Sequence, residues 1–477
     1  MERLIKINLP GGVVSAGDLY EILVIAENAG AQHIRFGSRQ QLFFSIRGDE
    51  LEDMEMEMLQ AGIAYEIDAD KCPNIISSYV CDTIFSSESW LREGVYKDIF
   101  DLFNYQPRLK INLIDRHQTF IPFFSGNFNF ISSDVSNYWY LHIRFPKTSR
   151  FYCWPTLIYS NDIPVISKKA EDVILKNKAF FYDTPEIDEQ LFFDMVTKGT
   201  AIHMQPLTAP LQLPDFYLPY YEGFNKYDNK YWLGVYRRNE LFEIAFLKDV
   251  CSLCLETRIG QLYTTPWKSI LIKGINPDDR NDWGFILDKY RLNVRHASNE
   301  LNWQIEDMCE EGLALKQRLV REFEEADLRT YRLSFTIKTQ PKTGLLGSVI
   351  IKTQPSGMFE VLHTADFNPN SRDYISYKKR VKSDSLVQHL VDLCNSYYQL
   401  SQSKTKNVIA AVKDTEDQPV GMELLYQCKH CFTVYDKAYG DELNAIPVGT
   451  DFADIDTYAC PVCEADKDSF ELLEKRL

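Results

Sequence analysis

Two Cys-x-x-Cys pairs near the end of the chain restrict its possible folds more than any other feature. They read Cys428-Lys429-His430-Cys431 and Cys460-Pro461-Val462-Cys463. Four thiolates in two short loops can close a tetrahedron around one ion, because each pair approaches the ion from one side. Zinc and a single iron both accept this geometry, so the spacing predicts a metal site without choosing the metal.

The chain has eleven cysteines, an odd number that rules out complete internal disulfide pairing. In a reducing compartment, the clustering of four of them indicates a metal site rather than disulfides. Cys251 and Cys254 lie three residues apart in a predicted helix, but no second pair nearby completes a metal site. We predict that they are buried structural cysteines, as are Cys72 and Cys81.

The length and the net charge of the chain limit its number of domains and the kinds of partner that it can bind. A chain of 477 residues is long for one hydrophobic core and predicts roughly two to four domains. With 52 Lys and Arg against 68 Asp and Glu, the net charge of −16 disfavours duplex nucleic acid or an anionic membrane as a partner. No stretch approaches the roughly 18 apolar residues of a membrane span, and the N-terminal segment does not read as a secretory signal. We therefore expect a cytoplasmic protein.

The residues around the four cysteines choose between the metals. In order along the chain they are Tyr426, Tyr435-Asp436, Gly440-Asp441, Ile446-Pro447-Val448-Gly449-Thr450, Phe452 and Lys467-Asp468-Ser469-Phe470. This segment closely resembles rubredoxin, whereas a zinc ribbon shares only the cysteines. The resemblance implies one iron ion, Fe3+ or Fe2+, on Cys428, Cys431, Cys460 and Cys463, with zinc as the competing metal.

Such a site has a restricted chemistry. Four thiolates saturate the iron, so no position stays open for a substrate, and one-electron exchange is what remains. Backbone N–H groups aimed at the sulfurs and an apolar shell set the reduction potential. The candidates for that shell, and equally for the packed core of a small domain, are Tyr426, Tyr435, Phe452, Tyr458 and Phe470.

Three positions depart from the rubredoxin pattern. Phe432 and Glu464 follow the second cysteine of each loop, where rubredoxins usually have Gly, and Tyr458 replaces the usual Trp. Gly is favoured there because the turn can require a positive φ. Residues 421–477 also contain 12 Asp and Glu against 5 Lys and Arg, which is −7 of the total charge. This charge either solvates a small domain or steers a basic redox partner.

The first 400 residues contain a duplication. Leu4 to Leu9 reads as a strand, Asp18 to Ala29 as an amphipathic helix, and Ile34 to Ile46 as strand, turn and strand. About two hundred residues later, Leu241-Phe242-Glu243-Ile244 repeats Leu19-Tyr20-Glu21-Ile22. A repeat of that length indicates a duplicated domain.

Two patches of this body look like a second family. Gly30 to Leu42 resembles the ferredoxin-like half-domain of sirohaem nitrite and sulfite reductases, and Tyr263 to Ile270 is similar to their second half-domain. The resemblance implies an α+β fold class, in which a duplicated reductase-like body is joined to a small rubredoxin domain with short β-strands. Larger α/β units are expected after each half-domain, with a helix from Ile305 to Glu325 and strands from Leu109 to Ile114 and from Tyr331 to Lys338.

The predicted boundaries follow from these patches. They are ferredoxin-like half-domains at 1–60 and 233–284, reductase-like α/β units at 61–205 and 285–400, a linker at 206–232, a tether at 401–421 and the rubredoxin domain at 422–477. The linker is rich in Pro and Tyr, whereas the tether is polar and charged. A flexible tether of about twenty residues would span some 25 Å.

The body lacks the cluster ligands of the reductases, which hold an iron–sulfur cluster beside sirohaem on a Cys-x5-Cys and a Cys-x3-Cys pattern. The corresponding loops are 77–82, 115–119, 296–300 and 339–343, and their only cysteine is Cys81. Sirohaem and a 4Fe–4S cluster are therefore not expected. His117 and His296 lie in these loops, and we predict no ligand role for either.

Arg35, Arg39 and Gln40 are the residues of the reductase pattern that remain. In that family, arginines at such positions bind anionic groups of the tetrapyrrole. Two interpretations stay open for the three residues. They are either exposed charges on a strand–turn edge or the remnant of an anion and tetrapyrrole pocket.

The favoured function is an electron-transfer protein whose body serves as a docking module, without catalytic residues. Its partners would be redox proteins, with a reductase as donor and, by analogy, a nitrite or sulfite reductase as acceptor. No Gly-x-Gly-x-x-Gly or Walker loop supports NAD, FAD or ATP binding. Two alternatives stay open. One is a redox enzyme whose body binds a tetrapyrrole fed by the rubredoxin domain, and the other is a zinc-binding structural protein.

Overall fold

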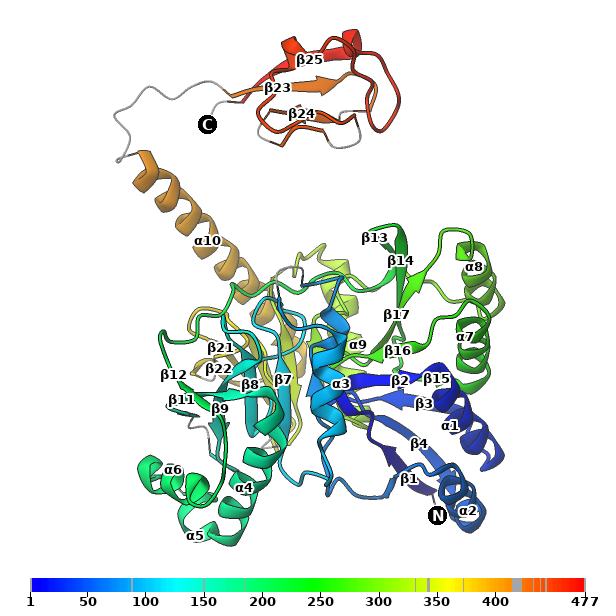
Figure 1. The fold of residues 1–477 in the computed structure, drawn as a ribbon, viewed down its shortest axis with the longest axis vertical. Coiled ribbons are helices and arrows are strands. Elements are labelled where there is room, and N and C mark those ends of the chain that lie inside the picture. The colour runs from blue at the N-terminus through cyan, green and yellow to red at the C-terminus, as the bar shows by residue number, and fades with distance from the viewer. Residues whose placement is uncertain are drawn as a thin grey trace. The chain divides into compact units, whose positions relative to one another are not determined.

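The computed structural model divides the chain into two units. Residues 2–86, 89–148, 151–184, 186–330, 332–340, 344–371, 373–413, 423–431, 433–437, 439–441 and 444–475 are described. The body comprises Met1–Tyr397, and the C-terminal unit comprises Tyr398–Leu477. Figure 1 follows the body from blue to yellow and the strands of the C-terminal unit in orange and red.

Two antiparallel five-stranded sheets form the ferredoxin-like part of the body, in the orders β15-β3-β4-β1-β5 and β13-β14-β17-β16-β2. The strands of the first sheet are β1 (Glu2–Ile7), β3 (His33–Phe36), β4 (Leu42–Arg47), β5 (Glu66–Ile67) and β15 (Phe242–Glu243). The strands of the second are β2 (Val13–Ser15), β13 (Gly223–Tyr227), β14 (Lys230–Tyr236), β16 (Gln261–Thr264) and β17 (Ser269–Ile275).

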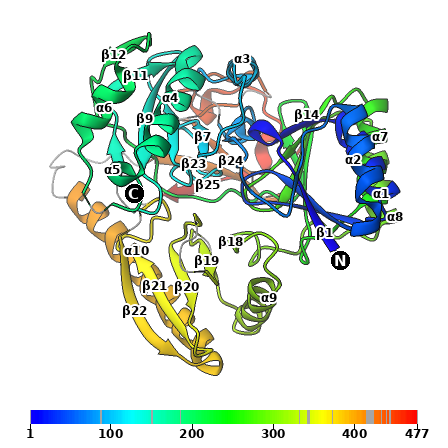
Figure 2. The same ribbon diagram turned by 90° about the horizontal axis from the view of Figure 1, so that it is seen from below.

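These two sheets exchange strands. β15 comes from the second repeat but pairs with β3 of the first, whereas β2 comes from the first repeat and pairs with β16 of the second. The helices α1 (Ala16–Asn28), α2 (Leu51–Ala61), α7 (Ile244–Glu256) and α8 (Arg280–Lys289) lie together along one side of both sheets, with α1 against α7 (Figures 1 and 2). One cluster of buried residues spans both repeats, so the duplicated halves share a single core.

A seven-stranded sheet forms the core of the first α/β unit, in the order β12-β11-β9-β8-β7-β6 with β10 beside β9. β6, β7 and β8 run parallel, and the remaining pairs are antiparallel. Every residue of β7 and β8 is buried, as is typical of parallel strands covered on both faces. The elements are β6 (Ile76–Ser77), β7 (Ile111–Ile114), β8 (Phe128–Ser132), β9 (Tyr138–Arg144), β10 (Phe151–Cys153), β11 (Thr156–Tyr159), β12 (Met204–Pro206), α3 (Glu93–Asp101), α4 (Ile163–Lys176), α5 (Lys178–Phe181) and α6 (Glu189–Thr197).

The second α/β unit repeats this plan. Its sheet has the order β18-β19-β20-β21-β22, again with parallel pairs first and antiparallel pairs after them. The elements are β18 (Trp303–Gln304), β19 (Phe335–Lys338), β20 (Val349–Thr353), β21 (Phe359–Thr364), β22 (Tyr374–Val381), α9 (Glu310–Glu325) and α10 (Leu386–Lys413). Short 3-10 segments occur at Pro10–Gly12, Gly48–Glu50, Tyr79–Cys81, Ser160–Asp162, Ser383–Ser385, Phe452–Asp454 and Lys467–Ser469.

Most predicted elements of the body are present with shifted ends. The helix expected from Ile305 begins at Glu310, and the strand expected from Tyr331 begins at Phe335. Tyr331 itself lies outside the described residues. The predicted linker at 206–232 requires a correction, because β13 and the start of β14 form a hairpin within it. Asp228 has a φ of 45° in the tight turn between the two strands, a conformation that Asp tolerates.

The predicted tether also requires a correction. Residues 401–413 continue α10, which is 28 residues long, and the later part, 414–421, lies outside the described residues. No Gly or Pro interrupts the sequence from Leu386 to Lys413, so the helix has no reason to end at residue 400. In the described part of the chain, no helix combines the length and the apolar character needed to cross a bilayer.

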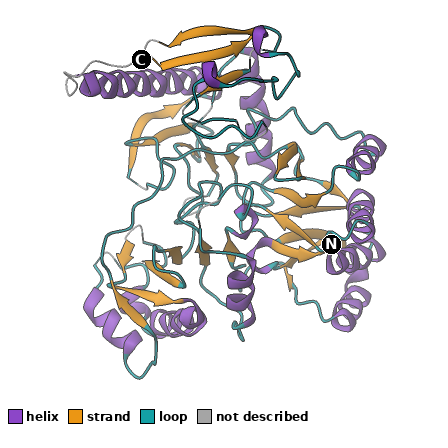
Figure 3. Ribbon diagram, turned by 45° about the horizontal axis from the view of Figure 1, so that its top comes forward, coloured by secondary structure: helices purple, strands orange, loops and turns teal. Residues whose placement is uncertain are grey.

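The C-terminal unit carries a small antiparallel sheet with the order β24-β23-β25. Its strands are β23 (Glu423–Cys428), β24 (Val434–Asp436) and β25 (Phe470–Lys475). Figure 3 shows these strands in orange, joined by long teal loops. A cluster of buried aromatic residues and cysteines forms the core below them, so the cysteines are part of the packing of this unit.

Candidate metal centre

Two loops of the same design hold the four cysteines. Cys428 ends β23 and its N–H donates to the carbonyl of Thr433 at 2.8 Å; the N–H of Cys460 donates to the carbonyl of Ala465 at the same distance. Each loop therefore closes through a hydrogen bond from the first cysteine to the residue five positions later. This local closure turns both cysteines of a pair toward one point.

The four sulfurs converge as the spacing predicts. The Sγ atoms of Cys428 and Cys463 are 3.6 Å apart, and those of Cys431 and Cys460 are 3.4 Å apart. All four lie within 4.8 Å of one another. A tetrahedron with metal–sulfur bonds of about 2.3 Å has edges of about 3.8 Å, so the set fits one tetrahedral ion. Among the described residues, no other group of three or more His, Cys, Asp or Glu side chains converges in this way.

The two members of each pair differ in exposure. Cys428 and Cys460 are buried in the aromatic core, whereas Cys431 is half-buried and Cys463 is exposed. Val462, beside Cys463, is 70% exposed. The metal position thus has an inner side covered by the domain and an outer side that a partner can approach.

Hydrogen bonds reach the outer sulfurs from within the loops. The backbone N–H of Thr433 donates to Cys431 and that of Ala465 to Cys463, at equivalent positions of the two loops. The hydroxyl of Thr433 lies 3.0 Å from the sulfur of Cys431. Hydrogen bonds from the side chain and the backbone of Thr433 lower the pKa of the Cys431 thiol to about 6. These contacts favour the thiolate form of Cys431, which is the form that binds a metal.

The predicted aromatic shell surrounds the inner cysteines. The rings of Tyr426 and Phe452 stack at 4.4 Å between centroids, and Tyr435, Tyr458 and Phe470 all contact Phe452. These side chains are both the core of the domain and the apolar cover of the site. Tyr458, which replaces the usual Trp, donates its hydroxyl to Asp441 at 2.7 Å. Burial and this hydrogen bond hold the pKa of Tyr458 above its usual value.

Glu464 adopts the backbone conformation for which Gly is favoured, with a φ of 59°. The equivalent position in the first loop, Phe432, lies outside the described residues. We expect Glu464→Gly to stabilise the metal-bound domain by about 1 kcal/mol, because it removes the steric cost of a β-carbon in the left-handed region. Urea unfolding followed by the metal's absorption measures the effect. Glu464→Ala is the control, since it removes the carboxylate and keeps the β-carbon; an equal gain in both variants would contradict the backbone explanation.

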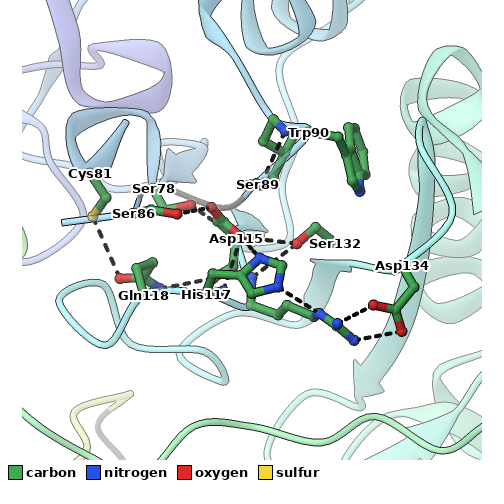
Figure 4. A network of polar contacts seen from close by, with 12 residues as sticks. Ser78, Cys81, Ser86, Ser89, Trp90, Asp115, His117, Gln118, Ser132 and Asp134 are labelled. Atoms are coloured by element: carbon green, nitrogen blue, oxygen red, sulfur yellow. Dashed lines mark hydrogen bonds and ion pairs between the residues drawn. The ribbon is translucent and has the colours of Figure 1, made fainter. Parts of the chain in front are cut away.

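A buried carboxylate organises the loops of the first α/β unit in which the reductases would place cluster ligands (Figure 4). Asp115 accepts hydrogen bonds from Ser86 at 2.6 Å, Ser132 at 3.2 Å and the N–H of His117 at 3.0 Å. The His117 ring nitrogen Nδ1 is 3.2 Å from the same carboxylate. The sulfur of Cys81 lies 3.5 Å from the amide oxygen of Gln118. Asp115 follows β7 and Ser132 ends β8, so their hydrogen bond joins the ends of these two strands.

The second α/β unit uses carboxylates in the same way. Glu222 accepts hydrogen bonds from the N–H groups of His296 and Ala297 at 3.1 and 3.2 Å, and Glu306 accepts one from the N–H of Thr339 at 2.9 Å. Sequence reasoning missed Glu222 and Glu306. No local pattern marks them, because their partners lie 74 and 33 residues away.

The three residues retained from the reductase pattern have protein partners. The guanidinium of Arg39 is buried and donates to the carbonyls of Asn74 at 2.7 Å and Ile111 at 3.0 Å. Gln40 is buried and donates to the carbonyl of Thr264. Arg35 forms an ion pair with Glu310 at 2.5 Å. The expectation of exposed charges is therefore wrong for Arg39 and Gln40, which are buried. A role of Arg35, Arg39 and Gln40 toward an anion or a tetrapyrrole stays a prediction.

Three of the four cysteines predicted to be structural are buried. Cys81, Cys251 and Cys254 have no exposed surface, and burial raises the pKa of Cys251 to about 12. Cys72 is only half-buried, so its prediction was too strong. It lies at the border of the first sheet, where its carbonyl accepts hydrogen bonds from Lys6 and Asn8.

Comparison with known proteins agrees with this geometry at the C-terminus. The rubredoxin family model matches residues 425–470. Over 46 residues the chain is 48% identical to the rubredoxin of Megasphaera elsdenii, covering 9% of this chain and 86% of that protein. It is 49% identical over 47 residues to the high molecular weight rubredoxin of Moorella thermoacetica, a match that covers 10% of this chain and only 20% of that relative's length.

The body resembles a solved structure. It superposes on the NirA protein of Mycobacterium tuberculosis with a TM-score of 0.62 and 15% identity, over 82% of this chain and 80% of that one. At this identity the likeness shows the fold. The mixed α and β architecture predicted for the body is thereby confirmed, and its fold is that of the NirA protein. The four converging cysteines and the sequence matches support an iron-binding electron-transfer domain at residues 425–470, and through this domain the chain belongs to the rubredoxin family.

Proposed function

We propose that the chain carries single electrons on one iron ion held by Cys428, Cys431, Cys460 and Cys463. The observation that supports this most strongly is the convergence of four sulfurs, all within 4.8 Å, in a domain of rubredoxin sequence. An iron ion in such a set supplies reversible exchange between the ferric and ferrous states. With four thiolates as ligands, no position is available for a substrate.

Different groups of the domain cover the metal site, expose it to a partner and stabilise its reduced state. Cys428 and Cys460 anchor the inner side of the site in the aromatic core, which excludes water from it. Cys431 and Cys463 reach the surface, so an electron leaves or enters on that side. The N–H groups of Thr433 and Ala465 donate to these outer sulfurs and stabilise the added negative charge of the reduced state.

Metal analysis and an absorption spectrum of anaerobically purified protein, before and after dithionite, test this proposal. We expect one iron per chain and a red ferric-thiolate spectrum that bleaches on reduction. Colourless protein with one zinc per chain would contradict electron transfer and support a zinc-binding structural protein. Additional tetrapyrrole bands would support the alternative function, a redox enzyme whose body binds a tetrapyrrole.

Thr433 gives a test of the hydrogen bonds to sulfur. Thr433→Val removes the hydroxyl 3.0 Å from Cys431 but keeps the backbone N–H. We expect the reduction potential to fall by about 40 mV, because about 1 kcal/mol of stabilisation of the reduced state is lost. Protein film voltammetry measures the shift. Thr433→Ser retains the hydroxyl and should leave the potential nearly unchanged, so an equal shift in both variants would refute the role of that hydroxyl.

We further propose that the reductase-like body docks the electron donor or acceptor, with a nitrite or sulfite reductase as the acceptor. The support is the fold of the body, which is an analogy at the level of fold. Stopped-flow oxidation of the dithionite-reduced protein by a sirohaem reductase tests this assignment. Equal oxidation rates for the full chain and for a chain lacking residues 1–385 would show that the body does not take part in docking.

A tetrapyrrole-binding body is the second candidate. Arg39 and Lys110 line a pocket of 420 Å³, and burial lowers the pKa of Lys110 to about 8. Asp70, Glu306 and Asp307 line the same pocket and would repel the carboxylates of sirohaem, which is why this candidate ranks second. Addition of sirohaem to the full chain, followed by absorption, separates the two functions: a shifted spectrum supports the second and an unchanged one removes it.

A further inference from the structure

A pocket rich in arginine lies in the body. It has a volume of 530 Å³ and is formed by the end of β14, the turn after α8 and the exposed side of α9. Four arginines line it: Arg237, Arg238, Arg291 and Arg321. Neither the electron-transfer function nor the reductase-like pattern accounts for this concentration of positive charge.

The surrounding protein is negatively charged. Removing the 5 basic and 12 acidic residues of 421–477 from the 52 and 68 of the whole chain leaves 47 and 56, a net charge of −9 for residues 1–420. A local cluster of cations on such a background attracts anions to one place, and the walls of a pocket focus the field further. The pocket is thus electrostatically distinct from the rest of the body.

One of the arginines is already neutralised. Arg238 donates to the buried carboxylate of Glu300 at 2.6 Å, and this hydrogen bond raises the pKa of Arg238. Glu324 is the only other carboxylate that lines the pocket among the described residues. Three guanidinium groups therefore face one carboxylate.

Backbone carbonyls hold two of the three remaining guanidinium groups. Arg237 donates from Nε to the carbonyl of Leu241, and Arg321 donates from Nε to the carbonyl of Gln317. Within the described residues, no carboxylate lies within ion-pair distance of Arg237, Arg291 or Arg321. These hydrogen bonds position Nε and leave the outer nitrogens of Arg237 and Arg321 directed to solvent or to a ligand, in the fork arrangement that suits phosphate and carboxylate oxygens.

We propose that this pocket binds a small polyanion, a phosphorylated or polycarboxylate metabolite, through Arg237, Arg291 and Arg321. The amide side chains of Asn239, Asn293 and Gln317 lie on its walls and supply further hydrogen bonds. Val320 and the ring of Tyr236 provide an apolar floor, so the ligand carries an uncharged part as well as its anionic groups. The inference is independent of the iron site.

Isothermal titration of the full iron-loaded chain with pyrophosphate and with citrate tests the proposal. We expect one of the two to bind with one site per chain, and its Kd to rise when NaCl is increased from about 50 to about 300 mM. Tighter binding of pyrophosphate would identify a phosphorylated ligand, and tighter binding of citrate a polycarboxylate.

Substitutions locate the binding. Arg291→Gln and Arg321→Gln should each weaken it at least tenfold, because each removes a charge-assisted fork. Arg258→Gln is the matched control: Arg258 is exposed, follows α7 as Arg291 follows α8, and has a φ of 61° where Arg291 has 52°. Thermal unfolding confirms that all variants are folded, and the iron spectrum reports separately on the electron-transfer site.

Two results would overturn the inference. Binding of neither probe at about 1 mM, or undiminished binding by both pocket variants, would show that the pocket is not a small-anion site. Arginine-dependent binding of polyglutamate without binding of either small anion would assign the pocket to an acidic protein surface instead.

Discussion

Cys460→Ser is expected to abolish the iron spectrum and to unfold the C-terminal domain while the body stays folded. Cys460 is 2% exposed and packs in the aromatic core. A domain of about fifty residues has too small a core to be stable alone, and metal binding contributes much of its folding free energy, of the order of 10 kcal/mol in small zinc domains. Loss of one soft thiolate therefore removes the iron and the fold together.

Iron content, absorption and differential scanning calorimetry measure this outcome. Two transitions should be seen in the parent chain and only that of the body in the variant. Cys153→Ser is the control, because Cys153 is an exposed cysteine on β10 of the body. It should retain both transitions and the full spectrum. Stoichiometric iron in Cys460→Ser would contradict the assignment of the ligands.

Asp115→Ala is expected to destabilise the body by about 3–5 kcal/mol. The carboxylate is 3% exposed and accepts hydrogen bonds from the hydroxyls of Ser86 and Ser132 and from the backbone N–H of His117. Its removal leaves buried donors without an acceptor, and each such hydrogen bond to a charged group contributes about 1.5–3 kcal/mol without full additivity. Urea unfolding, followed by tryptophan fluorescence, gives the difference in unfolding free energy.

The network of Figure 4 supplies a matched control for this prediction. Asp134 pairs with Arg116 in the same network, but its side chain is 69% exposed. An exposed ion pair contributes little, so Asp134→Asn should cost less than about 1 kcal/mol. If Asp115→Ala and Asp134→Asn had equal effects, the buried carboxylate would not organise these loops.

The metal site could be predicted from the sequence because its geometry is local. Each loop closes by a hydrogen bond over five residues. The first loop follows β23 and the second precedes β25, the strand that pairs with β23. The need for a positive φ after the second cysteine was also predictable, and Glu464 confirms it. Family-specific residues around a local motif therefore indicated both the four converging cysteines and the aromatic cover.

The duplication of the body was predictable for a similar reason, since repeated strand and helix patterns leave a trace in the sequence. The exchange of β2 and β15 between the sheets was not. Each of these strands has two or three residues, too few to show which sheet they join. The hairpin of β13 and β14 was missed because the Pro-rich segment before it led to the whole of 206–232 being interpreted as a linker.

What the sequence alone determined about this protein is thus what depends on neighbours along the chain: the four clustered cysteines, their turns, the repeated elements and the absence of nucleotide motifs. Only the tertiary structure decided which distant groups meet. Glu222 caps the loop at His296, Arg39 donates to the carbonyls of Asn74 and Ile111, and arginines from three separate segments line one pocket. Such contacts join side chains across folded elements, and sequence spacing carries no record of them.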